Sequence, residues 1–237
     1  METNQFHGFP EACVKFYLEL AQHNERAWFN EHKAQFEASV MAPARDFVEA
    51  MGIRLQEIAP GVVADPRVDR SIFRIYRDVR FSRDKSPFKT QLALWWWQGS
   101  RARMENSGFY FQLQPPDLML GVGIYRFPDN LLESYRQAVI DPQYGAALQH
   151  AIQQVHQHGN YTVGGQYYKK VPRGYDPDHP NANLLLHNGL YTGFEIPVPD
   201  LLYTPELVDF CFDRFNEMLP LHTWLVQFTE QFAEISG

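Results

Sequence analysis

The sequence predicts an α+β fold, an antiparallel sheet of four or five strands flanked by N-terminal and C-terminal helices. Two observations predict it. Apolar residues recur at helical spacing up to residue 58 and again after residue 129, whereas the segments between them are short, aromatic and partly alternating, as strands are. Because these strands follow one another instead of alternating with helices, the order favours α+β over a doubly wound parallel sheet.

The N-terminal part is expected to form three helices. Pro10 suits the first turn of a helix over about 10–22. Asn24 is expected to cap a second helix through its side-chain oxygen, with the alternative that it faces a binding site, and Trp28 belongs to the apolar stripe of that helix. The third helix ends at Pro60-Gly61, where both residues disfavour helix continuation.

The central part is expected to form the sheet. The segment SIFRIYRDVRF at 71–81 alternates apolar and polar residues and predicts a strand and its exit. Further strands are expected at 91–97, 108–113, 118–125 and 190–196. The turn-like sequence PPD at 115–117 joins two of these segments and predicts a hairpin.

The helices of the C-terminal half have recognisable start signals. A capping side chain followed by proline at the first helical position is a common helix beginning. Helix starts are expected at Asp129 or Asn130, at Asp141-Pro142, at Thr204-Pro205 and at Pro220.

Length and composition indicate a globular protein. The 237 residues are 45% hydrophobic and carry a net charge of −7, so we expect one domain over residues 1–237 with a substantial core. Cys13 and Cys211 lie among apolar residues at helical spacing, which favours buried, reduced thiols. Since neither a signal peptide nor a long apolar run occurs, we expect a soluble, cytoplasmic protein without membrane contact.

Charge is segregated along the chain. Between Arg67 and Lys89 lie eight basic and three acidic residues, a net of +5, which leaves 13 basic and 25 acidic residues elsewhere, a net of −12. Guanidinium groups bind phosphate or carboxylate bidentately, and a lysine adds a point charge. The segment therefore predicts recognition of a small anion by Arg74, Arg77, Arg80, Lys85 and Lys89.

The acidic residues of the same segment have two candidate roles. On a strand, Asp78 would lie between Arg74 and Arg80 and could orient them. If the protein is an enzyme, Asp78 or Asp84 would be its general acid or base. The bend at Ser86-Pro87 supplies the hydroxyls of Ser82, Ser86 and Thr90 and backbone donors that could cradle phosphate. The competing interpretation is a structural salt-bridge network that binds nothing.

The segment RIYRDVRFSRDKSPFKT at 74–90 resembles the signature of a conserved hypothetical protein family, domain of unknown function family 2461. LAQHNERAWF at 20–29, KKVPRGYDPDHPNANLL from 169 and LPLHTWL from 219 add to the resemblance, which spans essentially the whole chain. The resemblance implies a single domain but no activity. Its motif positions here are Arg77, Asp78, Arg80, Phe81, Asp84, Lys85, Pro87 and Lys89. Gln91, where family members often have His, and HNGL at 187–190 depart from the pattern.

Other constellations give weaker signals. The loop at 169–180 contains Arg173, which we include as an anion-binding candidate and a possible second wall of the site. Nine histidines lack the spacing of a zinc motif, so no metal is expected, and no sequence motif identifies a cofactor. Trp95, Trp96 and Trp97 could stack bases, although core packing of at least one face is the commoner use of consecutive aromatics.

Two functional hypotheses follow. The first is recognition of a phosphate- or carboxylate-bearing ligand, by an enzyme acting on a phosphorylated or nucleotide-like substrate or by a degenerate relative of one. The second is a binding module without chemistry, in which the basic segment docks nucleic acid or an acidic protein partner. The segregation of positive from negative charge is compatible with both.

Overall fold

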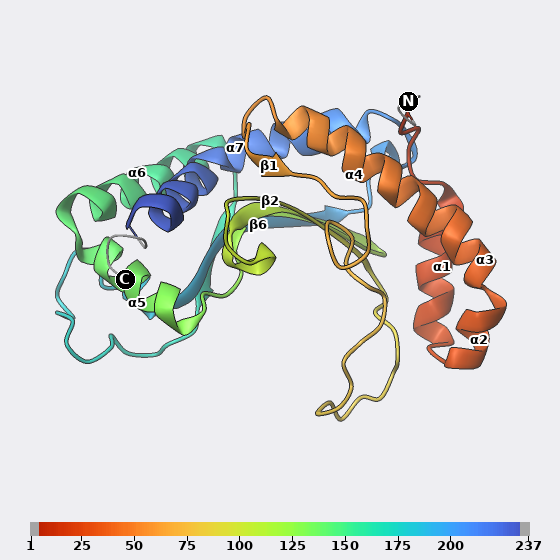
Figure 1. Cartoon of the computed structure of the whole chain (residues 1–237), viewed down its shortest axis with the longest axis horizontal. Helices are drawn as coiled ribbons and strands as arrows, with labels where there is room; N and C mark the ends of the chain where they lie inside the picture. Colours follow the sequence, from red (N-terminus) through yellow and green to blue (C-terminus); the bar gives the residue numbers. More distant parts are fainter. Residues whose placement is uncertain (1–4, 233–237) are drawn as a thin grey trace. The chain divides into compact units, whose positions relative to one another are not determined.

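The computed structural model describes residues 5–232 and confirms the α+β fold class. Its antiparallel sheet has six strands in the order β1-β2-β3-β4-β6-β5, with helices before and after it in the chain (Figure 1). The expected four or five strands were therefore too few. The sequence pattern missed β1 (Val62–Val63), which is only two residues long, and β5 (Thr162–Gln166), whose Gly164-Gly165 resembles a loop.

The chain forms two compact units. Unit 1 comprises the residues up to Trp96, Tyr110–Leu120 and Glu195–Asp213, and unit 2 comprises Trp97–Phe109, Gly121–Phe194 and the residues from Arg214 on. Four strands contribute residues to both units: β2 (Leu92–Gln98), β3 (Ser107–Gln114), β4 (Asp117–Ile124) and β6 (His187–Pro197). A single domain over residues 1–237 stays a prediction.

The first helix of unit 1 is the predicted one, and the second is broken. Pro10 is the N-cap of α1 (Glu11–Gln22). The helices after it are α2 (Arg26–Glu31), α3 (Lys33–Phe36), the π-helix η1 (Glu37–Met41) and α4 (Ala42–Leu55). The prediction that Asn24 caps the second helix was wrong. Glu25 is the N-cap of α2 and makes no side-chain capping bond, because Asn24 bonds a distant backbone instead.

Helix α4 covers one face of strands β2 and β3 in unit 1. Phe47 contacts Phe111 at 5.1 Å and Trp96 at 5.8 Å between ring centroids. The indole N–H of Trp96 donates to the carbonyl of Val48 at 3.0 Å, so the buried ring leaves no polar group unpaired. The side chains of Leu92, Leu94 and Trp96 lie on this buried face, which accounts for every second residue of the predicted aromatic strand.

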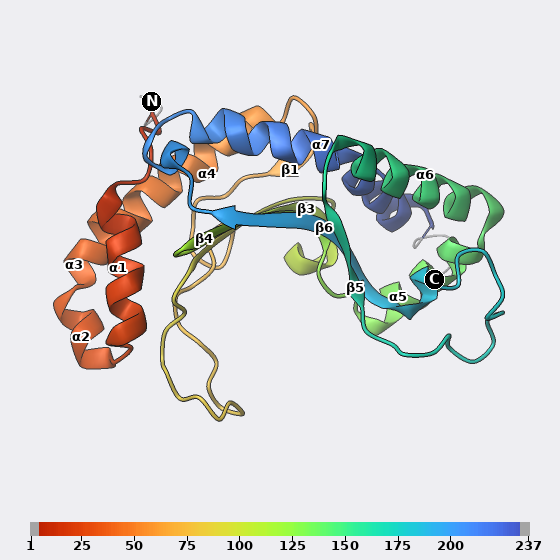
Figure 2. The same cartoon turned by 180° about the vertical axis from the view of Figure 1, so that it is seen from behind.

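The predicted strand at 71–81 is not formed. Residues 72–90 instead make two irregular legs and a projecting tip (Figures 1 and 2), and the isolated bridge Tyr76↔Phe88 pairs the two legs. Backbone bonds between the legs are few: the N–H of Lys89 donates to the carbonyl of Ile75 at 2.7 Å, and the N–H of Arg77 donates to the carbonyl of Pro87 at 2.9 Å. Beyond residue 77 the carboxylates of Asp78 and Asp84 accept from backbone N–H groups two residues further on. The alternation of apolar and polar residues there therefore reflects polar turns and not the hydrogen-bond ladder of a strand.

Unit 2 confirms one helix start and corrects another. Asp141 caps α6 (Pro142–His158) by accepting from the backbone N–H groups of Gln143 and Tyr144 at 2.9 and 2.8 Å. Pro220 does not begin a helix but lies inside α7 (Leu207–Gln227). Fully buried neighbours, among them Met218 and Leu221, continue the apolar stripe past the proline, and their burial offsets the lost backbone hydrogen bond.

The remaining elements of the chain are short or follow the predicted order. Helix α5 (Asp129–Ile140) precedes α6, and the π-helix η5 (Phe228–Phe232) follows α7. Three 3-10 turns complete the list: η2 (Arg103–Glu105), η3 (Leu184–Leu186) and η4 (Asp200–Tyr203). Cys13 and Cys211 are buried and free, as predicted. Within residues 5–232 there is no helix with the length and apolar character needed to cross a membrane.

Candidate functional site

The side chain of Asn24 holds the base of the charged loop, which we define as residues 74–90. Its amide nitrogen donates to the carbonyl of Phe88 at 3.0 Å, and its amide oxygen accepts from the N–H of Phe88 at 3.0 Å. The side-chain amide thus replaces a neighbouring strand, satisfying both backbone groups of one residue. These two bonds join the connection between α1 and α2 to the base of the charged loop.

Aromatic packing fixes the same position. Phe88 is 2% exposed and stacks on Phe29 of α2 at 4.4 Å between ring centroids. Tyr76, from the opposite leg of the loop, contacts Phe88 at 5.3 Å. The three rings hold both legs of the charged loop against the helices of unit 1, so residues next to Phe88 have defined positions.

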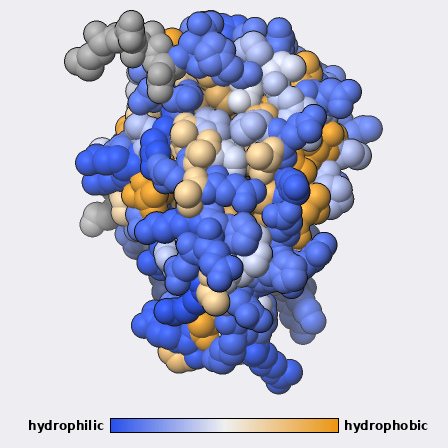
Figure 3. Space-filling model, turned by 90° about the vertical axis from the view of Figure 1, so that its right-hand side faces the viewer, coloured by the Kyte–Doolittle hydropathy of each residue, from blue (hydrophilic) through white to orange (hydrophobic). Residues whose placement is uncertain are grey.

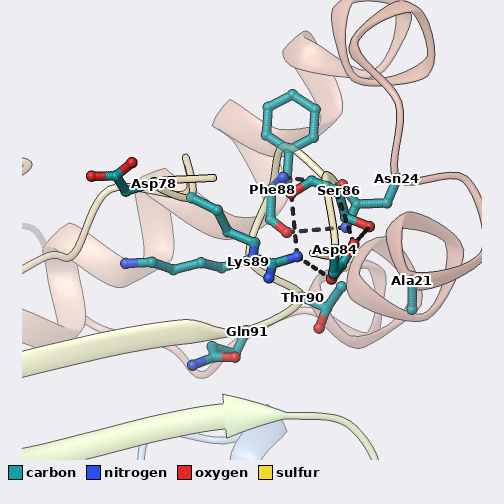
Figure 4. Close-up of a pocket in the computed structure, with 10 residues that line it drawn as sticks. Ala21, Asn24, Asp78, Asp84, Ser86, Phe88, Lys89, Thr90 and Gln91 are labelled. Carbon is teal, nitrogen blue, oxygen red and sulfur yellow. Dashed lines mark hydrogen bonds and ion pairs between the residues drawn. The ribbon is translucent and has the colours of Figure 1, made fainter. Parts of the chain in front are cut away.

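A cleft of about 660 Å³ opens beside this anchor (Figure 4). We call it the loop-base cleft. Its lining residues all belong to unit 1: Ala21, Asn24, Arg77, Asp78, Asp84, Ser86, Phe88, Lys89, Thr90 and Gln91. Its volume lies within the range of small-molecule sites. Figure 4 shows Asp84 and Ser86 close to Asn24, with Asp78 on the other side of Lys89.

Arg77 is held in place from one edge of its guanidinium. Its Nη1 donates to the carboxylate of Asp84 and to the carbonyl of Ser86, the latter at 3.3 Å. Its Nε and Nη2 form no hydrogen bond within residues 5–232, and the side chain is 28% exposed. A guanidinium with one edge fixed and another edge unused, lining a cleft, can receive a bidentate acceptor.

The two acidic residues are engaged in local turns. Asp84 accepts from the N–H and hydroxyl of Ser86 at 2.9 and 2.6 Å and pairs with Arg77. These bonds hold the pKa of Asp84 well below its usual range, the Ser86 hydroxyl being the main cause. Asp78 binds the Arg80 guanidinium and accepts from its backbone N–H, which lowers the pKa of Asp78 to about 2.

These pKa shifts bear on the predicted general acid or base. A carboxylate matched to proton transfer near neutral pH has a pKa raised toward 7, whereas both aspartates are shifted the other way. Each also has its acceptor atoms occupied by neighbouring donors. The geometry favours positioning of Arg77 and Arg80 over catalysis by Asp78 or Asp84.

The structure separates the predicted anion-binding residues. Arg77 and Lys89 line the loop-base cleft, and the ammonium of Lys89 lies 5.5 Å from the ring centroid of Phe73. Arg74, Arg80 and Lys85 are exposed and do not line the cleft; Lys85 donates to the carbonyl of Val79 at 2.9 Å. Arg173 is exposed and belongs to unit 2, on the connection between β5 and β6.

The lining of the cleft is charge-balanced and rich in neutral polar groups. Two cations, Arg77 and Lys89, face two carboxylates, each of which has a local donor. Sequence reasoning pointed to Ser86, Thr90 and the basic residues, but it noted Gln91 only as a departure from the family pattern and took Asn24 as a helix cap, with the site as the alternative. The distant pairing of Asn24 with Phe88 has no local sequence signal.

The face of the molecule in Figure 3 is mainly hydrophilic with scattered hydrophobic patches.

Within residues 5–232 there is no cluster of three or more His, Cys, Asp or Glu side chains that could hold a metal ion. Besides two carboxylates, the loop-base cleft offers guanidinium, ammonium, hydroxyl and amide groups. Such groups recognise polar or anionic atoms.

Comparison with known proteins identifies the family. The model of the conserved hypothetical protein family DUF2461 matches residues 12–224, which include the charged loop and all ten residues that line the cleft. No curated protein and no solved structure matches the chain. Because the family model covers most of the sequence, the chain belongs to the DUF2461 family of conserved hypothetical proteins.

Proposed function

We propose that the loop-base cleft binds a small ligand through a phosphate group. The observation that carries this proposal is the state of Arg77, whose Nη1 is held by Asp84 and Ser86 while its Nε and Nη2 have no partner within the described chain. Charge-assisted bonds from a guanidinium to an anion are stronger and more directional than neutral ones.

Preorganisation adds to the affinity. Ordering a long side chain on binding costs about 0.5–1.5 kcal/mol, and that cost falls when the side chain is already fixed. Asp84 and the Ser86 carbonyl fix Arg77 before ligand arrives. Lys89 supplies a second positive charge, and Thr90 supplies a neutral hydroxyl donor from the same cleft.

The proposed role is recognition, and we assign no reaction. Both carboxylates near the cleft remain ionised at neutral pH, with pKa values lowered by their donors, so neither holds a proton to give. Their role in the proposal is to position cations.

Isothermal titration calorimetry with inorganic phosphate tests the proposal. We expect Arg77→Met to weaken phosphate binding about 10- to 100-fold, the equivalent of losing about 1.5–3 kcal/mol of hydrogen bonding to a charged group. The matched control is Arg83→Met, which removes an exposed arginine of the same loop that does not line the cleft. Failure of the wild-type protein to bind phosphate, or equal losses in both variants, would overturn the proposal.

A second candidate function is supported by the tip of the charged loop. Phe81 is 96% exposed, with the Arg80 guanidinium 5.9 Å from its ring centroid and with Arg83 and Lys85 exposed nearby in the sequence. An exposed aromatic ring beside basic residues can stack a base of single-stranded nucleic acid while the cations contact phosphates.

Fluorescence anisotropy with a labelled single-stranded oligonucleotide tests this candidate. Binding that weakens steeply with salt and is lost in Phe81→Ser would support it. An oligonucleotide that does not bind, or binds equally to Phe81→Ser, would exclude base stacking at the tip, and the phosphate titration above would be unaffected by either result.

A further inference from the structure

The sheet of unit 1 has a second face, opposite the one that α4 covers. Along β3, Phe111 and Leu113 are buried, whereas Tyr110 and Gln112 are half-buried and Gln114 is exposed. Since successive side chains of a strand alternate between faces, these three share the side away from α4. We call this side the outer face.

A directional chain of amide groups runs across the outer face. The Gln91 amide nitrogen donates to the Gln112 oxygen at 3.2 Å, and the Gln112 nitrogen donates to the Gln114 oxygen at 3.1 Å. The Tyr110 hydroxyl also donates to the Gln112 oxygen, at 2.6 Å. These bonds hold Gln112 by both ends of its amide, so the row is fixed before any ligand binds.

Both ends of this row have unused hydrogen-bonding capacity. The Gln91 oxygen and the Gln114 amide nitrogen have no partner within the described residues. Gln91 lines the loop-base cleft, and Gln112 and Gln114 line a second hollow of about 320 Å³ at the β3–β4 turn. The row therefore connects two concave regions of unit 1, with an acceptor at one end and a donor at the other.

Aromatic rings continue the outer face toward the cleft. Phe73 meets Tyr110 edge-on with ring centroids 6.4 Å apart, and the Lys89 ammonium lies 5.5 Å from the Phe73 ring centroid. Both rings are partly exposed. Lys89, which lines the cleft, thus lies next to the rings of Phe73 and Tyr110. Tyr110 in turn bonds Gln112, the middle member of the amide row.

We propose that the outer face binds the polyhydroxylated part of a sugar phosphate whose phosphate occupies the loop-base cleft. This inference rests on the proposed function and adds the substrate class. Hydroxyl groups both donate and accept, so they match amide groups that present an oxygen at one end and an N–H at the other. The C–H groups of a sugar ring match the rings of Phe73 and Tyr110.

Calorimetry with four probes tests the inference: inorganic phosphate, ethyl phosphate, ribose 5-phosphate and glucose 6-phosphate. Ethyl phosphate has the ester charge without the hydroxyl groups. We expect at least one sugar phosphate to bind tenfold or more tightly than ethyl phosphate. In Gln112→Met that advantage should disappear while affinity for ethyl phosphate stays the same, because Gln112 does not line the loop-base cleft.

The control variant is Gln153→Met, which changes an exposed glutamine of α6 and should preserve the advantage. If phosphate binds but both sugar phosphates bind no more tightly than ethyl phosphate, the inference is overturned and the proposed function stands. An unchanged advantage in Gln112→Met also overturns it. If neither phosphate nor any ester binds, the proposed function fails, and the inference that rests on it fails too.

Discussion

The base and the tip of the charged loop share one composition but are held in different ways. At the base, Asn24 and Phe29 reach Phe88 from far away in the sequence, and the ring of Phe88 is buried. At the tip, Arg80 bonds Asp78 two residues away, and Phe81 is 96% exposed. Tertiary contacts fix the base, whereas local turns shape the tip.

The difference shows where a binding site can be preorganised. Exposed ion pairs contribute little to stability, so the tip can change shape at low cost. Buried rings and paired backbone groups resist change, so the cleft next to Phe88 keeps its geometry. If this difference is real, substitutions at the base should cost more than matched substitutions at the tip.

Truncating the two phenylalanines compares the regions directly. Phe88→Ala removes a buried ring and should lower the free energy of unfolding by about 3–5 kcal/mol. Phe81→Ala removes an exposed ring and should change it by less than about 0.5 kcal/mol. Urea denaturation followed by circular dichroism measures both. Similar losses in the two variants would show that the tip is packed in solution.

Removing the amide clamp should have an intermediate effect. Asn24→Ala leaves the N–H and carbonyl of Phe88 without their partner, at a cost of about 1–3 kcal/mol in unfolding free energy. Asn30→Ala, on the exposed side of α2, is the matched control and should be nearly neutral. Hydrogen exchange of the Phe88 amide should accelerate in Asn24→Ala alone; an unchanged exchange rate would contradict the clamp.

Breaking the Asp78–Arg80 pair should change the pKa of Asp78 clearly and the free energy of unfolding only slightly. The folded-state pKa of Asp78 is lowered from 3.8 to about 2, chiefly by the Arg80 side chain. Its ionised form therefore favours the folded state above pH 3.8, and that contribution is lost as the pH falls toward 2. In Arg80→Ala, carboxyl-carbon NMR should show the Asp78 pKa rising toward 3.8. A pKa near 2 in this variant would refute the assigned cause.

The smallest expected effect is that of Lys85→Met at the tip. Lys85 is exposed and donates to the carbonyl of Val79, a group that water can bond equally well. Thermal unfolding should change by no more than about 2 °C, and phosphate affinity should change less than threefold. A larger loss of phosphate affinity would move the site from the base to the tip.

Sequence periodicity predicted most of the fold because helix starts and aromatic strands have local causes. Pro10, Asp141 and the turn at 115–117 mark boundaries that the structure keeps. Where the prediction was wrong, a nonlocal contact decided the outcome. Burial on both sides of Pro220 lets α7 continue, and tertiary anchors together with charged turns replace a strand at 71–81.

The candidate site was predicted in its residue types but not in its arrangement. Charge segregation located the loop, and Arg77, Lys89, Asp78 and Asp84 do line one cleft. The separation of Arg80 and Lys85 from that cleft depends on which carboxylate or carbonyl each cation bonds. Composition holds no information on such pairings, and it holds none on the reach of Asn24 across 64 residues to Phe88.

A phosphate titration followed by ¹H–¹⁵N NMR of the assigned wild-type protein would show directly whether phosphate binds at the base of the loop or at its tip. We expect saturable shifts of the Arg77 side-chain Nε–H and of the Thr90 and Gln91 amides at the base. Signals of Phe81 and Arg83 at the tip should move little. Shifts confined to the tip, equal shifts in both regions, or no saturable shift at all would contradict phosphate binding at the loop-base cleft.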